Sequence, residues 1–153
     1  MSTTKSSKKT ASKKLKHPLK PKKLAKKAAS SEMCSRLGEF HWNELQTTDV
    51  AGAKTFYTKL FGWTTAPFGG TMDYTILLNE GQGFGGIMKA PRPGQSAMWL
   101  NYAVVKSVDA TLAKLKKLGG QVCCPPFDVP GVGRLSIVQD PQGAVFGIHA
   151  PKM

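Results

Sequence analysis

Apolar and polar residues alternate along residues 40–46, which is the pattern of a strand with one buried face. From residue 50 the apolar positions recur every three or four residues, which predicts a helix with one apolar stripe. That stripe consists of Ala53, Phe56, Tyr57 and Leu60. Asp49 is suited to cap the start of this helix and Gly62 to end it. Glycine-rich turns then separate three short strands, around residues 63–66, 74–78 and 84–88.

The same order of elements returns in the second half of the chain. With a shift of 58 residues, Asn43 falls on Asn101 and Gly62 on Gly120. The later strands align at a shift of 60, where "YTILLNEGQGFGGIMKAP" lies over "RLSIVQDPQGAVFGIHAP". The apolar stripe of the second helix consists of Leu112, Leu115 and Leu118, with Lys114, Lys116 and Lys117 outside it. This repeat predicts two βαβββ modules, residues 39–91 and 97–151, within one domain.

Two segments give this duplicated pattern a family resemblance. They are the helix entry "TTDVAGAKTFYTKLFGW" and the hairpin "DVPGVGRLSIVQDPQGAVFGI". With the paired modules, they make residues 39–151 resemble the vicinal oxygen chelate superfamily, which includes glyoxalase I, bleomycin-resistance proteins and extradiol dioxygenases. The resemblance implies an α+β domain over residues 38–153, in which a mixed sheet of eight strands curls around a cleft. It also implies a small organic ligand in that cleft, and a homodimer.

In the metalloenzymes of this superfamily, each module supplies two metal ligands, one from its first strand and one from its last. The resemblance places the first-strand positions at Trp42 and Leu100, within one residue. The last-strand positions fall at Ile87 and Gly147 with the same margin. None of these side chains offers a metal an oxygen or nitrogen lone pair. We therefore expect neither a metal site nor a cofactor.

Strand alternation predicts which other side chains reach the cleft. Glu44 shares the face of Trp42, and Tyr102 matches Glu44 in the second module. Lys89 and His149 occupy equivalent places near the ends of the two last strands. An aromatic wall with a few polar groups suits a small organic ligand. The predicted ligand-binding residues are Trp42, Glu44, Lys89, Tyr102, Arg134 and His149.

Simpler explanations exist for several of these residues. Glu44 and His149 are candidates for a general base and acid if they lie within hydrogen-bonding distance. Glu44 could equally pair with Lys89 at the rim of the cleft, and Arg134 by default forms a surface ion pair. His41 precedes the cleft-facing position by one residue, so alternation predicts that it points to the opposite face as a packing or solvent-facing side chain.

The first 37 residues differ sharply in composition from the rest. They contain 11 Lys and Arg36 against one acidic residue, Glu32, which gives a net charge of +11; the remaining 116 residues have 10 basic and 8 acidic groups, or +2. Without aromatic residues, residues 1–37 are predicted to be a disordered tail. Counterion release would give this tail sequence-independent affinity for DNA or RNA. The predicted nucleic-acid contacts are Lys8, Lys9, Lys13, Lys14, Lys16, Lys20, Lys22, Lys23, Lys26 and Lys27.

The cysteines and the hydropathy of the chain indicate a cytoplasmic protein. Cys34, Cys123 and Cys124 form no evident disulfide pattern, and no segment is apolar and long enough for a secretory signal or a membrane span. Two hypotheses follow. In the first, the domain binds, and in some versions transforms, a small organic molecule without a metal. In the second, the tail associates with nucleic acid and the domain serves as a dimerising anchor. The simpler alternative to this second hypothesis is that the tail is only a solubilising or targeting extension.

Overall fold

The computed structural model describes residues 36–69 and 73–152. The first module comprises β1 (Phe40–Thr47), α1 (Val50–Phe61), β2 (Thr64–Pro67), β3 (Tyr74–Asn79) and β4 (Gln82–Lys89). The second comprises β5 (Met98–Val104), α2 (Val108–Lys117), β6 (Gln121–Val129), β7 (Gly133–Gln139) and β8 (Val145–Pro151). The predicted βαβββ modules are therefore present. The ten lysines predicted to contact nucleic acid lie outside the described residues.

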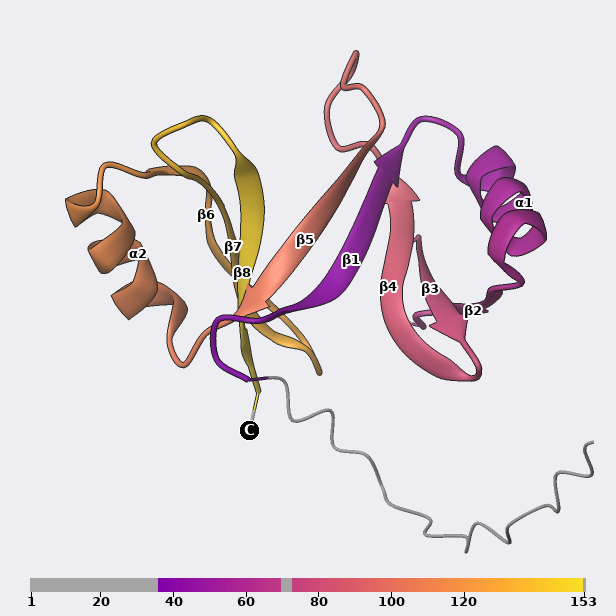
Figure 1. Cartoon of the computed structure of the whole chain (residues 1–153), viewed down its shortest axis with the longest axis horizontal. Coiled ribbons are helices and arrows are strands. Elements are labelled where there is room, and N and C mark those ends of the chain that lie inside the picture. Colours follow the sequence, from indigo (N-terminus) through magenta and orange to yellow (C-terminus); the bar gives the residue numbers. More distant parts are fainter. Residues whose placement is uncertain (1–35, 70–72, 153) are drawn as a thin grey trace, which may run out of the picture. The chain divides into compact units, whose positions relative to one another are not determined.

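All eight strands belong to one mixed sheet, in the order β2-β3-β4-β1-β5-β8-β7-β6. Within each module the first and last strands run parallel, β1 beside β4 and β5 beside β8. The modules join where β1 and β5 pair antiparallel, side by side at the centre of Figure 1. At this seam Asn101 Nδ2 donates to Asn43 Oδ1 at 2.6 Å, and these two residues are the ones matched by the 58-residue repeat. The sheet remains open, and the fold is α+β as predicted.

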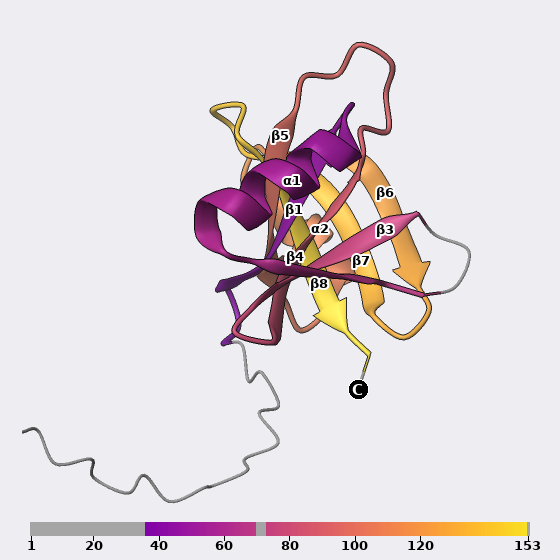
Figure 2. The same ribbon diagram turned by 90° about the vertical axis from the view of Figure 1, so that its right-hand side faces the viewer.

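The two helices cover the faces of the sheet that point away from the cleft. Leu45, Leu77 and Ile87 pack under α1, and Val138 and Ile148 pack under α2. In Figure 2, α1 lies across the strands of its own module. The buried apolar side chains of each module thus pack against the helix of the same module. The opposite face of the sheet is therefore free to form a binding site.

The ends of α1 form as the sequence predicts. The Asp49 carboxylate accepts a hydrogen bond from the Gly52 N–H at 2.8 Å, as an N-cap does. Gly62 ends the helix in the left-handed conformation, with φ of 72°. The predicted apolar stripe is only half correct, because Ala53 and Tyr57 pack on the sheet whereas Phe56 and Leu60 are 57% and 55% exposed.

The repeat aligns the later strands one residue differently from the sequence comparison. Glu44 pairs with Gly86 on β4, and its counterpart Tyr102 pairs with Gly147 on β8, so the shift is 61 rather than 60. The same shift holds along β3, since Ile76 pairs with Gly86 and Ile137 pairs with Gly147. The Gln-Gly pairs matched in the sequence comparison are not equivalent, because residues 82–83 begin β4 whereas residues 142–143 lie in the turn before β8. A one-residue slip moves every later side chain to the other face of a strand.

Within the described ranges, no helix is long and apolar enough to cross a membrane.

Candidate functional site

A cavity of about 960 Å³ lies on the face of the sheet opposite the helices, between the two modules. Aromatic side chains form much of its wall: Trp42, Phe68, Tyr74, Tyr102 and Phe127. The Pro/Gly loop of residues 128–132 also borders it. A volume of this size is at the upper end for small-molecule sites, and the mixed aromatic and polar lining is typical of them.

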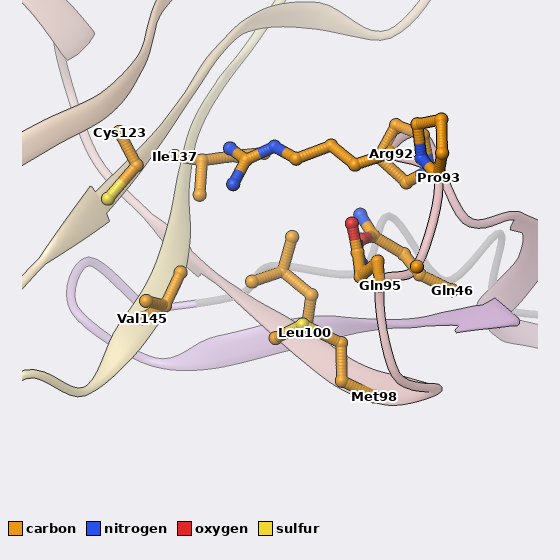
Figure 3. A pocket seen from close by; sticks show the side chains of 11 residues that line it. Gln46, Arg92, Pro93, Gln95, Met98, Leu100, Cys123, Ile137 and Val145 are labelled. Carbon is orange, nitrogen blue, oxygen red and sulfur yellow. Dashed lines mark hydrogen bonds between the residues drawn. The ribbon is translucent and has the colours of Figure 1, made fainter.

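A smaller hollow of about 390 Å³ adjoins this cavity and shares part of its lining. Figure 3 shows Arg92 extending over this hollow and the side chains of Gln46 and Gln95 next to each other. Gln95 Nε2 donates to Gln46 Oε1 at 2.7 Å, so the segment between β4 and β5 is tied to the floor of the site. Leu100 lines only this smaller hollow.

Glu44 lines the cavity and is held by three hydrogen-bond donors. Its Oε1 accepts from Tyr102 Oη at 3.2 Å and from Gln46 Nε2 at 2.9 Å. Its Oε2 accepts from Tyr74 Oη at 3.2 Å. Trp42 Nε1 in turn donates to Tyr74 Oη at 2.9 Å. Although Glu44 is only 7% exposed, its carboxylate is therefore fully supplied with hydrogen bonds, which is the condition for burying such a group.

The two tyrosines that hold Glu44 have strongly shifted acidity. Burial raises the pKa of Tyr74 far above its ordinary value, and the negative charge of Glu44 raises it further. The pKa of Tyr102 is raised by burial and then by the same carboxylate. Both hydroxyls are therefore protonated at neutral pH and can donate to Glu44.

His41 lies in the cavity wall, so the prediction that it points to the opposite face is wrong. The β1–β5 pairing shifts register between Phe40 and Trp42, and this bulge brings His41 onto the same side as Trp42. His41 Nδ1 lies 3.0 Å from the Tyr102 carbonyl oxygen, and its Nε2 lies 3.0 Å from His149 Nδ1. Burial lowers the pKa of both histidines. His149 therefore has His41, not Glu44, as its side-chain partner.

The four positions that correspond to metal ligands carry no suitable donors. Trp42 lines the cavity and Leu100 the adjoining hollow. Ile87 packs under α1, which corrects its expected place, and Gly86 holds the equivalent position on β4. A Cβ atom at Gly86 would collide with the Tyr74 ring, and one at Gly147 would collide with the Tyr102 ring. In residues 36–69 and 73–152, no three His, Cys, Asp or Glu side chains gather in a way that could hold a metal ion.

Two predicted ligand-binding residues lie outside the cavity. Lys89 is exposed and does not line it, because the one-residue slip gives the place equivalent to His149 to Met88. Arg134 forms ion pairs with Asp109 at 3.0 Å and Asp128 at 2.8 Å. Arg134 also holds the pKa of Asp109 below its usual range. The simpler surface explanation is therefore correct for Arg134.

Several cavity residues were absent from the sequence-based set. Tyr74 and Gln46 both bind Glu44, and Cys123 and Cys124 both line the cavity although they are adjacent in the chain. The register of β6 on β7 shifts at these cysteines, which removes the alternation that would separate them. The signal for Gln46 was present, because it shares the alternating face of Trp42 and Glu44.

Comparison with known proteins places this geometry in a family context. The family model described as Glyoxalase/Bleomycin resistance protein/Dioxygenase superfamily matches residues 39–148. The Mycobacterium tuberculosis protein named "Putative glyoxylase CFP32" is 40% identical over 122 residues, covering 74% of this chain and 46% of that protein. "Anthracycline biosynthesis protein DnrV" of Streptomyces peucetius is 32% identical over 123 residues, covering 70% of this chain and 45% of that protein. The chain thus spans about half the length of these curated relatives.

Solved structures share the fold at low sequence identity. Methylmalonyl-CoA epimerase from Streptomyces coelicolor superposes with a TM-score of 0.58 at 13% identity, covering 77% of this chain and all of the epimerase chain. The Mn(II)-bound glyoxalase from Novosphingobium aromaticivorans gives a TM-score of 0.54 at 21% identity, covering 76% of this chain and 40% of the glyoxalase chain. At such identities the likeness establishes the arrangement of helices and strands, and the chemistry has to be argued from the site itself.

Proposed function

Because this chain belongs to the Glyoxalase/Bleomycin resistance protein/Dioxygenase superfamily, we propose that its domain binds a small organic molecule in the inter-module cavity without a metal at the four family positions. The observation that carries the proposal is the buried Glu44 carboxylate, fixed by two tyrosines beneath a largely aromatic cavity. A ligand would stack on the aromatic walls and place a few polar atoms against this fixed floor. Lyase or dioxygenase chemistry of the metal-dependent kind would need donors that Trp42, Gly86, Leu100 and Gly147 do not supply.

The printed names of relatives and neighbours suggest which compounds to test. One relative is named as a glyoxylase, another belongs to anthracycline biosynthesis, and one structural neighbour is an acyl-CoA epimerase. We propose planar aromatic and dicarbonyl compounds as first probes, since the walls include Trp42 and Phe127. Binding should quench Trp42 fluorescence, and Trp42→Ala should remove the response while the protein stays folded. A response that survives in Trp42→Ala would place the binding site elsewhere, near Trp63 or Trp99.

The metal-free part of the proposal has its own test. Elemental analysis of the purified protein should find no stoichiometric Zn, Ni, Mn or Fe. A chelator should leave the melting temperature unchanged, because no bound metal contributes to stability. A native mass spectrum of protein purified without a histidine tag would also report a copurifying ligand and test the predicted homodimer. One transition-metal ion per chain would contradict the assignment of the ligand positions.

A second candidate function rests on the charge of residues 1–37, which is +11 against +2 for the rest of the chain. We propose nonspecific binding of DNA or RNA through these lysines. The full chain should retard duplex DNA of any sequence at low salt and release it steeply as salt rises. Deletion of residues 1–37 should abolish this binding. Equal DNA affinity of the shortened and full chains would exclude the tail as the binding element.

A further inference from the structure

Three contacts join His41 and His149 to each other and to two carbonyl oxygens. His41 Nδ1 lies 3.0 Å from the Tyr102 oxygen, and His41 Nε2 lies 3.0 Å from His149 Nδ1. His149 Nε2 lies 3.3 Å from the Val132 oxygen. The ring planes differ by 13° and the ring centroids are 5.0 Å apart, so the two facing nitrogens lie between the rings. A carbonyl oxygen can only accept, so the three contacts require three hydrogens.

Two neutral imidazoles supply only two hydrogens for these three contacts. Placing both hydrogens on Nδ1 satisfies the two contacts of 3.0 Å and leaves a lone pair on His149 Nε2, opposite the Val132 oxygen at 3.3 Å. In every other placement of the two hydrogens, at least one of the two 3.0 Å contacts has no hydrogen between its atoms, or has two hydrogens that repel each other. The vacant proton position of the neutral pair is therefore His149 Nε2, on a side chain that lines the cavity.

We propose that His149 Nε2 accepts the proton of a weak organic acid bound in the cavity, such as a phenol, an enol or a carboxylic acid, and that His41 positions His149 for this step. The ligand O–H bond breaks, its electron pair stays on the ligand oxygen, and an N–H bond forms at Nε2. The product is an organic anion beside a histidine pair with one positive charge, in which all three contacts now contain a hydrogen. This inference rests on the proposed binding function and defines the class of its ligand.

Glu44 cannot take this proton without losing its own partners. Its oxygens already accept from Tyr74, Tyr102 and Gln46, and the carboxylate is buried. The histidine pair, by contrast, gains a hydrogen bond on protonation. Other titratable or charged groups that border the same cavity are Asp73, Tyr74, Arg92, Tyr102, Cys123, Cys124 and Asp128.

The electrostatic environment supports a neutral pair in the ligand-free protein. Burial lowers the pKa of His41, and this effect outweighs the hydrogen bond to the Tyr102 carbonyl, which raises the pKa. Burial also lowers the pKa of His149; the Val132 carbonyl raises it, and His41 lowers it. A lowered pKa leaves the acceptor nitrogen of His149 unprotonated at neutral pH. The same burial makes the pair a weak base, so the proposed transfer depends on the negative charge of the ligand anion, which favours the protonated pair once the ligand is bound.

The first test uses the full-length protein without a ligand. Nitrogen-15 NMR of the histidines at neutral pH should show both His41 and His149 with the hydrogen on Nδ1 and a lone pair on Nε2. On acidification the two rings should take up one proton between them in a single step. A hydrogen on His149 Nε2 at neutral pH, or independent titration of the two rings, would overturn the inference.

The second test uses 4-nitrophenol, whose ionised form has its own absorbance band, with 4-nitroanisole as a probe that has no acidic hydrogen. Below the pKa of the free phenol, the bound phenol should be ionised in the wild-type protein, with occupancy measured by equilibrium dialysis. His149→Asn keeps a donor near His41 but lacks the Nε2 nitrogen, so the bound phenol should stay un-ionised. His41→Asn keeps a donor to Tyr102 and should reduce the ionised fraction. His17→Asn changes the remaining histidine of the chain and should have no effect.

The outcomes separate this inference from the proposed function. If 4-nitrophenol binds but stays un-ionised, or ionises equally in His149→Asn, the proton transfer is wrong while small-molecule binding stands. If 4-nitroanisole binds and 4-nitrophenol does not, the ligand class is wrong. If neither probe binds and the wider aromatic and dicarbonyl screen is also negative, the proposed function fails together with this inference.

Discussion

On strand β1 the side chain at the floor of the cavity is Glu44, and at the equivalent place on β5 it is Tyr102. Near the ends of the last strands, Met88 on β4 corresponds in the same way to His149 on β8. The opposite face of the sheet does not diverge like this, because Ile87 and its counterpart on β8 are both buried aliphatic residues. Packing under the helices thus imposes the same requirement on both modules, whereas the cavity face has specialised into a carboxylate side and an imidazole side.

The outer surfaces of the two helices differ as well. On α1, Phe56, Leu60 and Phe61 are all more than half exposed. On α2, Lys114 stands at the place of Phe56 and is followed by Lys116 and Lys117. Leu60 corresponds to Leu118, which is likewise exposed, at 66%. The modules therefore share the buried positions that define the fold, and they differ at several positions where a side chain meets solvent or the cavity. Four predictions test this separation, in order of decreasing effect.

The largest effect should come from equivalent core positions. Ile87 and Ile148 are 0% and 2% exposed under α1 and α2, respectively. Ile87→Ala and Ile148→Ala should each lower the free energy of unfolding by about 2–5 kcal/mol, because each leaves a cavity in a packed core. Chemical denaturation measures this, and Val145→Ala at a partly exposed position serves as the control. A large loss in only one module would break the equivalence of the two cores.

The hydrogen bonds to Glu44 should give the next largest effect. Tyr74→Phe and Tyr102→Phe each remove one donor to a buried carboxylate and should cost about 1.5–3 kcal/mol. Tyr74→Phe should cost more, since Tyr74 also accepts from Trp42. In a Glu44→Gln background both costs should shrink, and a double-mutant cycle measures that coupling. Costs that are unchanged in this background would show that the tyrosines act through packing alone.

The imidazole side should make stability depend on pH. The pKa values of His41 and His149 are lowered in the folded protein, so the unfolded chain binds protons more readily below the ordinary value of about 6.5. Stability should be greatest above that pH and should decrease as the pH falls through it. Thermal melts between pH 7.5 and 5.5 should show this decrease, and His149→Asn should weaken it while His17→Asn leaves it intact. A melting temperature that rises on acidification would contradict the assignment.

The smallest effect should come from the exposed face of α1. Phe56→Ser and Leu60→Ser should change the free energy of unfolding by no more than about 0.5 kcal/mol, because these side chains are mostly in solvent. Leu112→Ala on the buried face of α2 is the contrasting control, with an expected loss of about 2–5 kcal/mol. A large loss at Phe56 would mean that this face packs against a partner in solution.

Sequence patterns predicted the elements that depend on local chemistry. The Asp49 cap, the Gly62 helix end and the cavity-facing parity of Glu44 and Tyr102 all follow from residues close together in the chain. Two features of strand pairing could not be read in this way. The bulge beside His41 changes which face that side chain meets and accounts for its wrong placement. The turns of the two last hairpins differ in length, residues 80–81 against 140–144, so the sequence comparison matched the last strands one residue out of register and misplaced Ile87 and Lys89.

Other errors arose because the deciding contact lies far away in sequence. Tyr74 reaches Glu44 only because β3 lies two strands away from β1 in the sheet, with β4 between them. The amphipathic pattern of α1 predicts which residues are apolar, but the amount of sheet available beneath the helix decides which of them are buried. Only Ala53 and Tyr57 of the predicted stripe find such a surface, which leaves Phe56 and Leu60 in solvent.

The tyrosine rings over Gly86 and Gly147 also constrain how this site can change during evolution. A single substitution that placed a carboxylate at Gly147 would drive its Cβ into the Tyr102 ring, and the same holds for Gly86 and Tyr74. Each tyrosine would have to become smaller first, and that step removes a hydrogen bond from the buried Glu44. Gaining a metal ligand at either glycine therefore requires a step that weakens the hydrogen bonding of the buried Glu44. Phe68 and Phe127 of the cavity wall are both 38% exposed and contribute no hydrogen bond to Glu44, so their exchange does not require this step.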